Sequence, residues 1–262
     1  MKQGNRSLLR SAAKLLPMPL RRSCRDLILG QVLGWQPGSY LLESQALLEV
    51  SLDMILSDYR RSHQEVVFLQ IGAFDGVFGD PIYPLIDRHL LRGFLIEPQR
   101  DMFNRLKSNY ARFESSRFVF ANTAITERDG LVPLYRVRAD ADGPEWLRGI
   151  ASLDRDVLMR HTRMFPELES VIEVECVPGT TFTSLFREFG IGHVDLLQID
   201  AEGCDGRILR LFDVPSRKPA IIQFEHKHLD IGDYKNCLES LIDQGYRVAH
   251  GPADTLAYNP QY

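Results

Sequence analysis

One stretch near the end of the first quarter of the chain constrains the fold more than any other. Residues 66–71 read Val-Val-Phe-Leu-Gln-Ile, and the turn that follows carries Gly72, Asp75 and Gly76. A mostly apolar run of this length, without polar alternation, is typical of a strand buried on both faces of an α/β sheet. Glycines directly after it let the backbone turn tightly and approach a ligand at the carboxyl end of the strand. The stretch therefore predicts a ligand loop on the first strand of a parallel sheet.

Apolar runs and helical patterns alternate along the rest of the chain. Further strands are predicted at residues 93–97, 117–122, 171–177, 194–200 and 220–225. Helices are predicted at residues 82–91, 99–110, 182–189, 207–212 and 233–244. Residues 131–137 alternate like an edge strand, and 246–249 with 255–258 resemble a closing antiparallel hairpin. This order indicates an α/β fold with a doubly wound, mostly parallel sheet and right-handed crossovers.

The amino-terminal part of the chain differs in charge from the rest. Residues 1–25 hold seven basic residues and no acidic one, whereas the remainder holds 24 basic and 35 acidic residues. A helical pattern at 6–16 with its bases on one stripe is typical of an arm that packs on the protein itself, rests on anionic lipid, binds a partner or targets an organelle. A second helical pattern, at 39–61, predicts helices that cap the sheet.

The domain organisation follows from these patterns. We expect a basic arm with capping helices over residues 1–61 and one sheet domain over 62–262. Within that domain, residues at about 139–169 lack strand periodicity and are expected to form an insertion or lid over the site. An acidic body argues against nucleic acid as a partner. Four widely spaced cysteines and no apolar run of membrane-spanning length favour a cytoplasmic setting, and nothing indicates an oligomeric state.

The glycine loop narrows the choice of cofactor. It lacks the Gly-Lys-Ser/Thr ending of a triphosphate-binding loop, and Ala73 and Phe74 break the dinucleotide pattern Gly-x-Gly-x-x-Gly. Glu97 ends the second predicted strand, 25 residues after Gly72, where a carboxylate accepts hydrogen bonds from the ribose hydroxyls of an adenosine-type cofactor. Asp75 and Asp80 make the loop acidic, which suits a cofactor with a cationic centre such as a sulfonium.

An ordered set of short motifs covers residues 66–248. They are IGAFDG at 71–76, IEP at 96–98, ANTAI at 121–125, ASL at 151–153, VPGTT at 177–181 and DLLQIDAEG at 195–203. In this order the motifs resemble those of the FkbM-type methyltransferase family. The resemblance implies a Rossmann-like fold of the class I methyltransferase type, with S-adenosylmethionine as cofactor. It also implies methylation of a hydroxyl on a sugar, a polyketide or another small-molecule acceptor.

The resemblance also assigns residues to the cofactor. It places Gly72, Ala73, Asp75 and Gly76 at the methionine end, Glu97 at the ribose, and Asn122, Thr123 and Ala124 on the adenine side. The family commonly has Asn where Phe74 stands and Lys where Gln198 stands. Asp75 can supply the polar side chain that position 74 lacks, whereas Gln198 cannot supply a charge.

Methyl transfer to oxygen needs a hydroxyl aligned with the S–CH3 bond and a base that takes its proton. Candidates follow two predicted strands: Asp200 and Glu202 come at the end of 194–200, and Glu225, His226 and His228 come at the end of 220–225. His226 is the first choice as general base, since its ordinary pKa of about 6.5 is close to working pH. In a second version Asp200, which also borders the cofactor, joins Glu225 and His226 as ligands of a divalent metal such as Mg²⁺.

Several alternatives stay open. Glu225 and His226 also fit a structural role, capping the end of the sheet by hydrogen bonds, and Cys204 fits a buried packing role. The remaining histidines favour surface roles; they are His63, His89, His161, His193 and His250. The function expected first is O-methylation of a sugar or secondary metabolite. The alternatives are a nicotinamide-dependent Rossmann oxidoreductase and a catalytically silent nucleoside-binding domain whose arm, residues 1–25, contacts a membrane or a partner.

Overall fold

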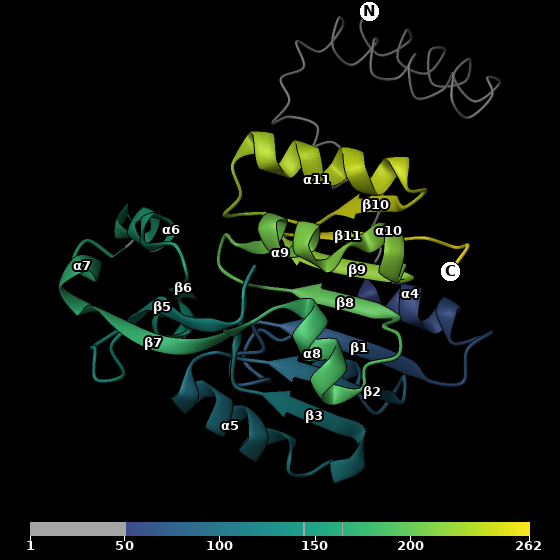
Figure 1. Ribbon diagram of the computed structural model, residues 1–262, viewed down its shortest axis with the longest axis horizontal. Helices are drawn as coiled ribbons and strands as arrows, with labels where there is room; N and C mark the ends of the chain where they lie inside the picture. The colour runs from purple at the N-terminus through teal and green to yellow at the C-terminus, as the bar shows by residue number, and fades with distance from the viewer. Residues whose placement is uncertain (1–50, 144, 164) are drawn as a thin grey trace, which may run out of the picture. The chain divides into compact units, whose positions relative to one another are not determined.

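The computed structural model describes residues 51–143, 145–163 and 165–262, and a seven-stranded sheet runs through them (Figure 1). Its strands are β1 (Val66–Ile71), β2 (Leu91–Ile96), β3 (Phe118–Ala121), β8 (Leu196–Ile199), β9 (Ile221–Glu225), β10 (Arg247–His250) and β11 (Asp254–Tyr258). Their order is β10-β11-β9-β8-β1-β2-β3. Neighbouring strands pair in parallel except at β11, which runs antiparallel to both β9 and β10. The sheet is therefore Rossmann-like and mostly parallel, and the predicted fold class is confirmed.

Strand β1 lies in the interior of this sheet, as its sequence predicts. All six of its residues are buried, because β2 and β8 flank it and both faces are covered. Val66 and Phe68 belong to a core cluster with Leu56 and Tyr59 of helix α4 (Leu52–Tyr59). The Tyr59 hydroxyl also donates to Asp195 Oδ1 at 2.7 Å, which fixes α4 to the start of β8. Helix α4 is thus part of the sheet's core.

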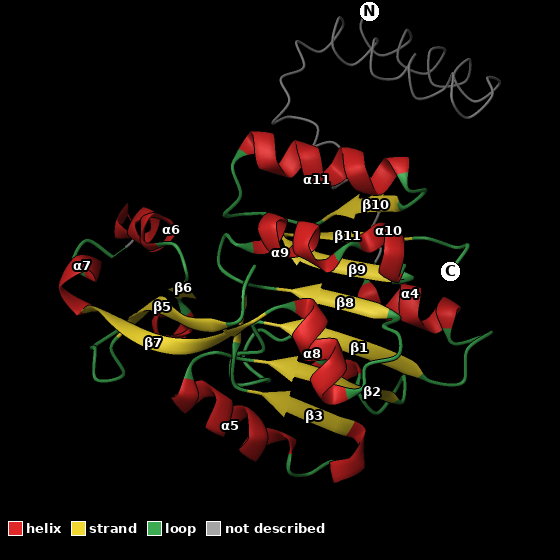
Figure 2. Ribbon diagram, viewed as in Figure 1, coloured by secondary structure: helices red, strands yellow, loops and turns green. Residues whose placement is uncertain are grey.

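The other helices follow the predicted alternation. They are α5 (Arg100–Tyr110), α8 (Phe182–Phe189), α9 (Asp205–Phe212), α10 (Val214–Arg217) and α11 (Ile231–Asp243). Helices α8 and α9 cover the face of the sheet opposite α4 (Figure 2). Helix α8 shows why these ends are well defined: Thr181 caps its start by accepting from the Ser184 N–H, and Gly190 ends it in the left-handed conformation.

The helix predicted at residues 82–91 is wrong. Only one 3₁₀ turn, η2 (Tyr83–Leu85), forms there, and turns follow until β2 begins. Pro84 lacks the N–H that a longer helix would need, and Asp80 Oδ1 accepts from the N–H groups of Ile82 and Tyr83 instead. Leu90 then takes a positive φ of 52°, which turns the chain directly into β2.

A second, four-stranded sheet contains the strand expected at 131–137, but the expected edge position is wrong because this strand has a neighbour on each side. Its strands are β4 (Ala124–Ile125), β5 (Gly130–Val137), β6 (Ala151–Ser152) and β7 (Ile172–Thr180), in the order β4-β7-β5-β6. Strand β5 pairs antiparallel with β7 from Gly130–Gly179 to Val137–Ile172, so neither strand extends the main sheet. This sheet projects beyond the carboxyl ends of the parallel strands (Figure 2).

The segment between β5 and β7 contains the insertion expected at about 139–169. Besides β6 it forms η4 (Glu145–Gly149), α6 (Arg155–Arg160), η5 (His161–Arg163) and α7 (Leu168–Val171). Leu147, Ile150, Leu158 and Leu168 pack with Val137 of β5 into a separate small core. The insertion is thus anchored on the second sheet by its own apolar side chains.

The predictions for the basic arm lie outside the described residues. This holds for the helix at 6–16, for the membrane or partner contact of residues 1–25, and for residues 39–50 of the second helical pattern. No helix in the part of the chain that the structure describes is long and apolar enough to cross a membrane.

Candidate active site

A cavity of about 260 Å³ opens where β1, β2 and β8 end. The strand ends contribute Gly72, Glu97 and Asp200 to its wall, while the second sheet and the insertion contribute Leu134 and Ser152 on another side. Ligands of open α/β sheets bind outside the carboxyl ends of the strands. The second sheet therefore encloses a position where a ligand is already expected.

Gly72 is required by the close approach of two loops. Its φ of 77° is in the left-handed region, and a Cβ added there would lie 1.8 Å from the carbonyl oxygen of Asp200. Its N–H donates to Ile96 O at 2.9 Å. The ends of β1, β2 and β8 are thus held together at one glycine.

Glu97 offers a buried carboxylate to the cavity. Its side chain is held in place because Oε2 accepts from the Phe74 N–H at 2.8 Å and Oε1 from the Gln99 N–H at 2.7 Å. Burial raises the pKa of Glu97, to about 8, although these two bonds favour the ionised form. Each oxygen keeps a lone pair for a further donor. The carboxylate is therefore oriented to accept hydrogen bonds from a ligand's hydroxyls.

Gln99 supplies a second polar group to the same wall. Its side chain is 2% exposed, and Oε1 has no hydrogen-bond partner among the described residues. Buried polar atoms of native proteins are generally paired, so an unpartnered amide oxygen beside a cavity indicates a missing donor such as an amino group of a ligand.

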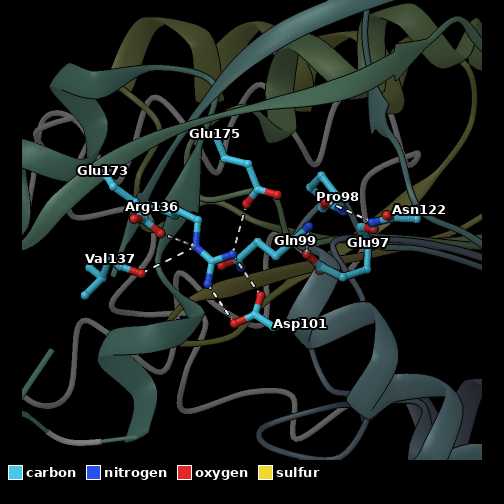
Figure 3. A network of polar contacts seen from close by, with 9 residues as sticks. All are labelled: Glu97, Pro98, Gln99, Asp101, Asn122, Arg136, Val137, Glu173 and Glu175. Carbon is cyan, nitrogen blue, oxygen red and sulfur yellow. Dashed lines mark hydrogen bonds and ion pairs between the residues drawn. The ribbon is translucent and has the colours of Figure 1, made fainter. Parts of the chain in front are cut away.

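Figure 3 shows an ionic network that braces this wall from behind. Arg136 of β5, 5% exposed, donates to both carboxylate oxygens of Asp101 in α5 at 2.8 and 2.7 Å. It also contacts Glu175 at 3.0 Å and Glu173 at 3.6 Å, both in β7. Partial burial acts to raise the pKa of Asp101, but the hydrogen bonds and charge of Arg136 outweigh it and the pKa is lowered. One guanidinium thus joins the second sheet to the first turn of α5.

The sequence reasoning did not identify this network. The available signal was a charged residue at an inward position of an alternating strand: Arg136 follows the buried Leu134 at the two-residue period of β5. Its partners lie 35 to 39 positions away, so they could not be assigned without the fold.

The residues assigned to the cofactor divide into two groups. Those that line the cavity are Gly72, Glu97, Thr123, Ala124 and Asp200. Those that do not line it are Ala73, Asp75, Gly76 and Asn122, so their expected ligand contacts are not present in the wall.

The second group shapes the wall from behind. Asp75 Oδ1 accepts from the N–H groups of Val77 and Phe78, which closes the glycine loop. Gly76 has no room for a side chain, because a Cβ would lie 2.4 Å from Leu106 Cδ1. Asn122 Nδ2 donates to the carbonyl oxygens of Glu97 and Pro98 at 2.8 and 2.9 Å (Figure 3). Ala73 is buried in the core beside α5.

The candidate catalytic residues are also separated. Asp200 lies in the cavity wall, and the surrounding protein together with the carboxylates of Asp254 and Asp80 raises its pKa to about 6. Glu225 and His226 do not line the cavity. His226 Nδ1 contacts Thr255 Oγ1 at 2.9 Å and its ring stacks on Tyr234, with centroids 4.7 Å apart. Burial lowers the pKa of His226 to about 4. The structure therefore places a neutral histidine just after the carboxyl end of β9, and not a base at the cavity.

The expected metal set is not assembled either. Among the described residues, the group whose ligand atoms lie within 4.8 Å of one another is His161, Glu202 and His228, not Asp200, Glu225 and His226. The surface role expected for His161 is wrong, because its side chain is 5% exposed. It is wrong for His89 as well, which is buried against Asp53 at 2.6 Å. The sequence gives no signal for His161, since the insertion's fold alone brings it to the strand ends.

The profile described as methyltransferase FkbM domain matches residues 70–248. The chain belongs to the FkbM methyltransferase family. The matched range includes the glycine loop, Glu97 and Asp200, so these parts of the cavity wall belong to the matched domain. The resemblance on which the sequence assignment rested is thereby confirmed.

Solved structures give more distant similarities. The crystal structure of methyltransferase FkbM from Methylobacillus flagellatus KT shares 15% identity with a TM-score of 0.49, and the match covers 97% of this chain and 58% of that chain. This chain thus spans less than two thirds of that protein. The N-terminal domain of human METTL16 shares 10% identity with a TM-score of 0.43, and the match covers 79% of this chain and 66% of that chain. M. capricolum TrmK in complex with S-adenosyl-homocysteine shares 9% identity with a TM-score of 0.36, and the match covers 78% of this chain and 66% of that chain. No match was found among curated proteins.

Two positions, 74 and 198, depart from the FkbM pattern. Phe74 has a φ of 47°, a left-handed conformation that Asn adopts more readily than Phe, yet its N–H still reaches Glu97. Gln198 is 3% exposed in β8 and lies in register between Gln70 of β1 and Gln223 of β9. This member of the FkbM family therefore has a row of neutral amides where a lysine would put a charge.

Proposed function

We propose that this chain is an S-adenosylmethionine-dependent O-methyltransferase that acts on a hydroxyl of a sugar or secondary metabolite. The observation that carries the proposal is the Glu97 carboxylate, buried at the end of β2 and oriented by two backbone N–H groups next to the Gly72 turn. A carboxylate in this position suits the two hydroxyls of a ribose.

The rest of the cavity fits the same cofactor. Thr123 and Ala124 offer a wall next to Glu97, and the unpartnered Gln99 oxygen offers an acceptor for an exocyclic amine. Among the described residues that form the wall there is no lysine or arginine, so the cavity suits a cationic sulfonium better than a chain of phosphates. When bound, the cofactor supplies an electrophilic methyl group.

Asp200 is our candidate for the base. It is in the cavity wall, and a pKa raised to about 6 brings its proton affinity closer to neutral pH, as general bases require. The Asp200 carboxylate would take the proton of the acceptor hydroxyl while the walls formed by Leu134, Ser152 and Phe74 exclude water from the transfer. His226 and Glu225 have no part in this proposal, since neither lines the cavity.

Calorimetry with S-adenosylhomocysteine and, separately, with NAD⁺ and NADP⁺ tests the cofactor. We expect saturable 1:1 binding of S-adenosylhomocysteine and no binding of either dinucleotide. Tight dinucleotide binding without a response to S-adenosylhomocysteine would make the chain an oxidoreductase and overturn the proposal.

The acceptor requires a second assay. Incubation with methyl-labelled cofactor and a panel of sugars, polyketides and phenols is expected to label a hydroxyl, located by NMR of the product. Label on nitrogen or carbon would contradict O-methylation while leaving the cofactor assignment in place. Cofactor binding without labelling of any acceptor in the panel would favour the catalytically silent binding domain.

A further inference from the structure

Three side chains from separate segments of the chain converge at the edge of the cavity. His161 comes from η5 in the insertion, Glu202 follows β8, and His228 follows β9. Glu202 Oε2 lies 3.7 Å from His161 Nε2 and 3.5 Å from His228 Nε2, and the three ligand atoms are all within 4.8 Å of one another. Glu202 also lines the cofactor cavity, so the cluster borders the candidate active site.

Three of the atoms at this cluster are buried and have no hydrogen-bond partner among the described residues. His161 is 5% exposed, and its Nε2 is unpartnered among the described residues, as are Glu202 Oε2 and a second carboxylate oxygen, Glu225 Oε2. Glu225 Oε2 lies 3.7 Å from His228 Nε2. Buried polar atoms without partners are rare and costly, so several of them facing one point indicate a shared ligand.

The spacing suits an ion better than direct contacts. Hydrogen bonds between nitrogen and oxygen are about 2.7–3.2 Å long, and the two contacts to Glu202 exceed that range. Donors bound at about 2.0–2.2 Å in a tetrahedral site stand roughly 3.4 Å apart. The observed 3.5 and 3.7 Å are close to this value.

The backbone also holds the cluster in place. Glu202 has a φ of 45°, and Gly203 after it has a φ of 86°, so two successive left-handed residues direct the Glu202 side chain. Such conformations are costly for a residue other than glycine and concentrate at functional sites. From the other side, Arg160 Nη1 donates to His228 O at 2.7 Å and connects the insertion to the loop after β9.

We infer that His161, Glu202 and His228 bind one divalent first-row transition ion, such as Zn²⁺ or Mn²⁺, with the Glu225 carboxylate beside it. Two imidazoles and a carboxylate are donors that such ions prefer, whereas Mg²⁺ prefers oxygen ligands alone. The ion joins the insertion to the ends of two main-sheet strands. None of its three ligands is the proposed base, so the ion is an addition to the proton transfer proposed above, although Glu202 borders the same cavity.

Metal titration of the full-length, chelator-treated protein tests the site. We expect one Zn²⁺ to bind per chain by calorimetry, Co²⁺ to give the visible absorption of a nitrogen-ligated ion, and Mg²⁺ to bind far more weakly. His161→Ala and His228→Ala should each weaken Zn²⁺ binding by roughly 100-fold or more, since even indirect partners of a metal contribute up to that factor. Glu202→Gln should weaken it as well.

Controls separate ion binding from folding. His193→Ala removes an exposed histidine remote from the cluster and should leave Zn²⁺ affinity unchanged. Zn²⁺ should raise the melting temperature of the wild type but not of His161→Ala, whose ion-free melting temperature gives the reference for folding. Zn²⁺ affinity that is unchanged in both histidine variants, or a failure of Zn²⁺, Mn²⁺ and Co²⁺ to bind the wild type, would overturn the inference.

Discussion

The backbone N–H of Phe74 donates to Glu97 Oε2 across 2.8 Å, although the two residues belong to the loops after different strands. This bond aligns the Glu97 carboxylate with the cavity and holds Phe74 in its left-handed conformation. The glycine loop and the carboxylate are therefore one structural unit.

Glu97→Gln tests that unit. Gln keeps the volume but has one acceptor oxygen in place of two, so either a backbone N–H or a ribose hydroxyl loses its partner. We expect S-adenosylhomocysteine to bind about 1–3 kcal/mol more weakly, measured by calorimetry. Glu114→Gln, a change at a residue outside the cavity, is the control. Equal affinity in the wild type and Glu97→Gln would remove Glu97 from the cofactor site.

The raised pKa of Glu97 predicts a pH dependence of cofactor binding. Below about pH 8 the buried carboxyl of the free protein is largely protonated, whereas two ribose hydroxyls need the ionised form as acceptor. Binding then releases a proton, so affinity should rise with pH up to about 8 and level off above it. Calorimetry in buffers of different ionisation enthalpy measures the released proton, and Glu97→Gln should abolish both effects.

Asp200→Asn tests the proposed base. An amide of the same shape cannot take a proton, so turnover should fall by about 10²–10⁴ while S-adenosylhomocysteine affinity changes little. In the chelator-treated wild type kcat/KM should rise as pH increases through about 6, where Asp200 ionises. A variant that keeps wild-type turnover across this pH range would exclude Asp200 as the base.

Gly72→Ala tests the contact between the β1 and β8 loops. A residue with a Cβ in the left-handed conformation lowers the free energy of unfolding by about 1–2 kcal/mol. The clash between this Cβ and Asp200 O lowers it by about 1–3 kcal/mol more. Gly190→Ala is the matched control, because its φ is 61° but a Cβ there meets nothing within 4 Å. Denaturant unfolding should show the larger loss for Gly72→Ala, and equal losses would mean that the close approach has no energetic weight.

Arg136→Met tests the network of Figure 3. It leaves Asp101, Glu173 and Glu175 without their cation, and we expect a loss of about 2–4 kcal/mol in unfolding free energy. Arg138→Met is the control, since Arg138 and Asp140 form an exposed pair at 3.5 Å that is expected to contribute little.

The same network sets a pH dependence. The pKa of Asp101 is lowered in the folded protein, so its contribution is present above its ordinary pKa and is lost as pH falls through the folded value. The stability difference between wild type and Arg136→Met should therefore shrink in acid. A difference that stays constant into acid would mean that the charge of Asp101 does not contribute.

The main sheet could be predicted from the sequence because its parallel strands are mostly buried and read as largely apolar runs. Val66–Ile71 is the clearest case, and its predicted bounds are those of β1. Strand β5 shows the limit of such reasoning: its alternation reveals one buried face but not the partner, and that partner is β7, some forty residues later in the chain.

The site was less predictable for a related reason. Glu97 and Asp200 are at strand ends, where the topology alone directs them to the cavity. His226 is also at a strand end, but Thr255 of the neighbouring antiparallel strand β11 contacts its side chain and holds His226 against β11, away from the cavity. His161 depends on the path of an irregular segment, which periodicity does not encode.

The insertion begins after Val137 of β5 and ends before Ile172 of β7, two residues that face each other in the register of these strands. A segment whose two ends are neighbours can change in length at little entropic cost, since closing a longer loop adds only about 0.6 kcal/mol per doubling. None of the main-sheet strands lies between these ends. The insertion can therefore vary in length and sequence while the strand ends below it stay the same. We expect relatives to differ in acceptor preference through changes in this insertion and to keep the same cofactor.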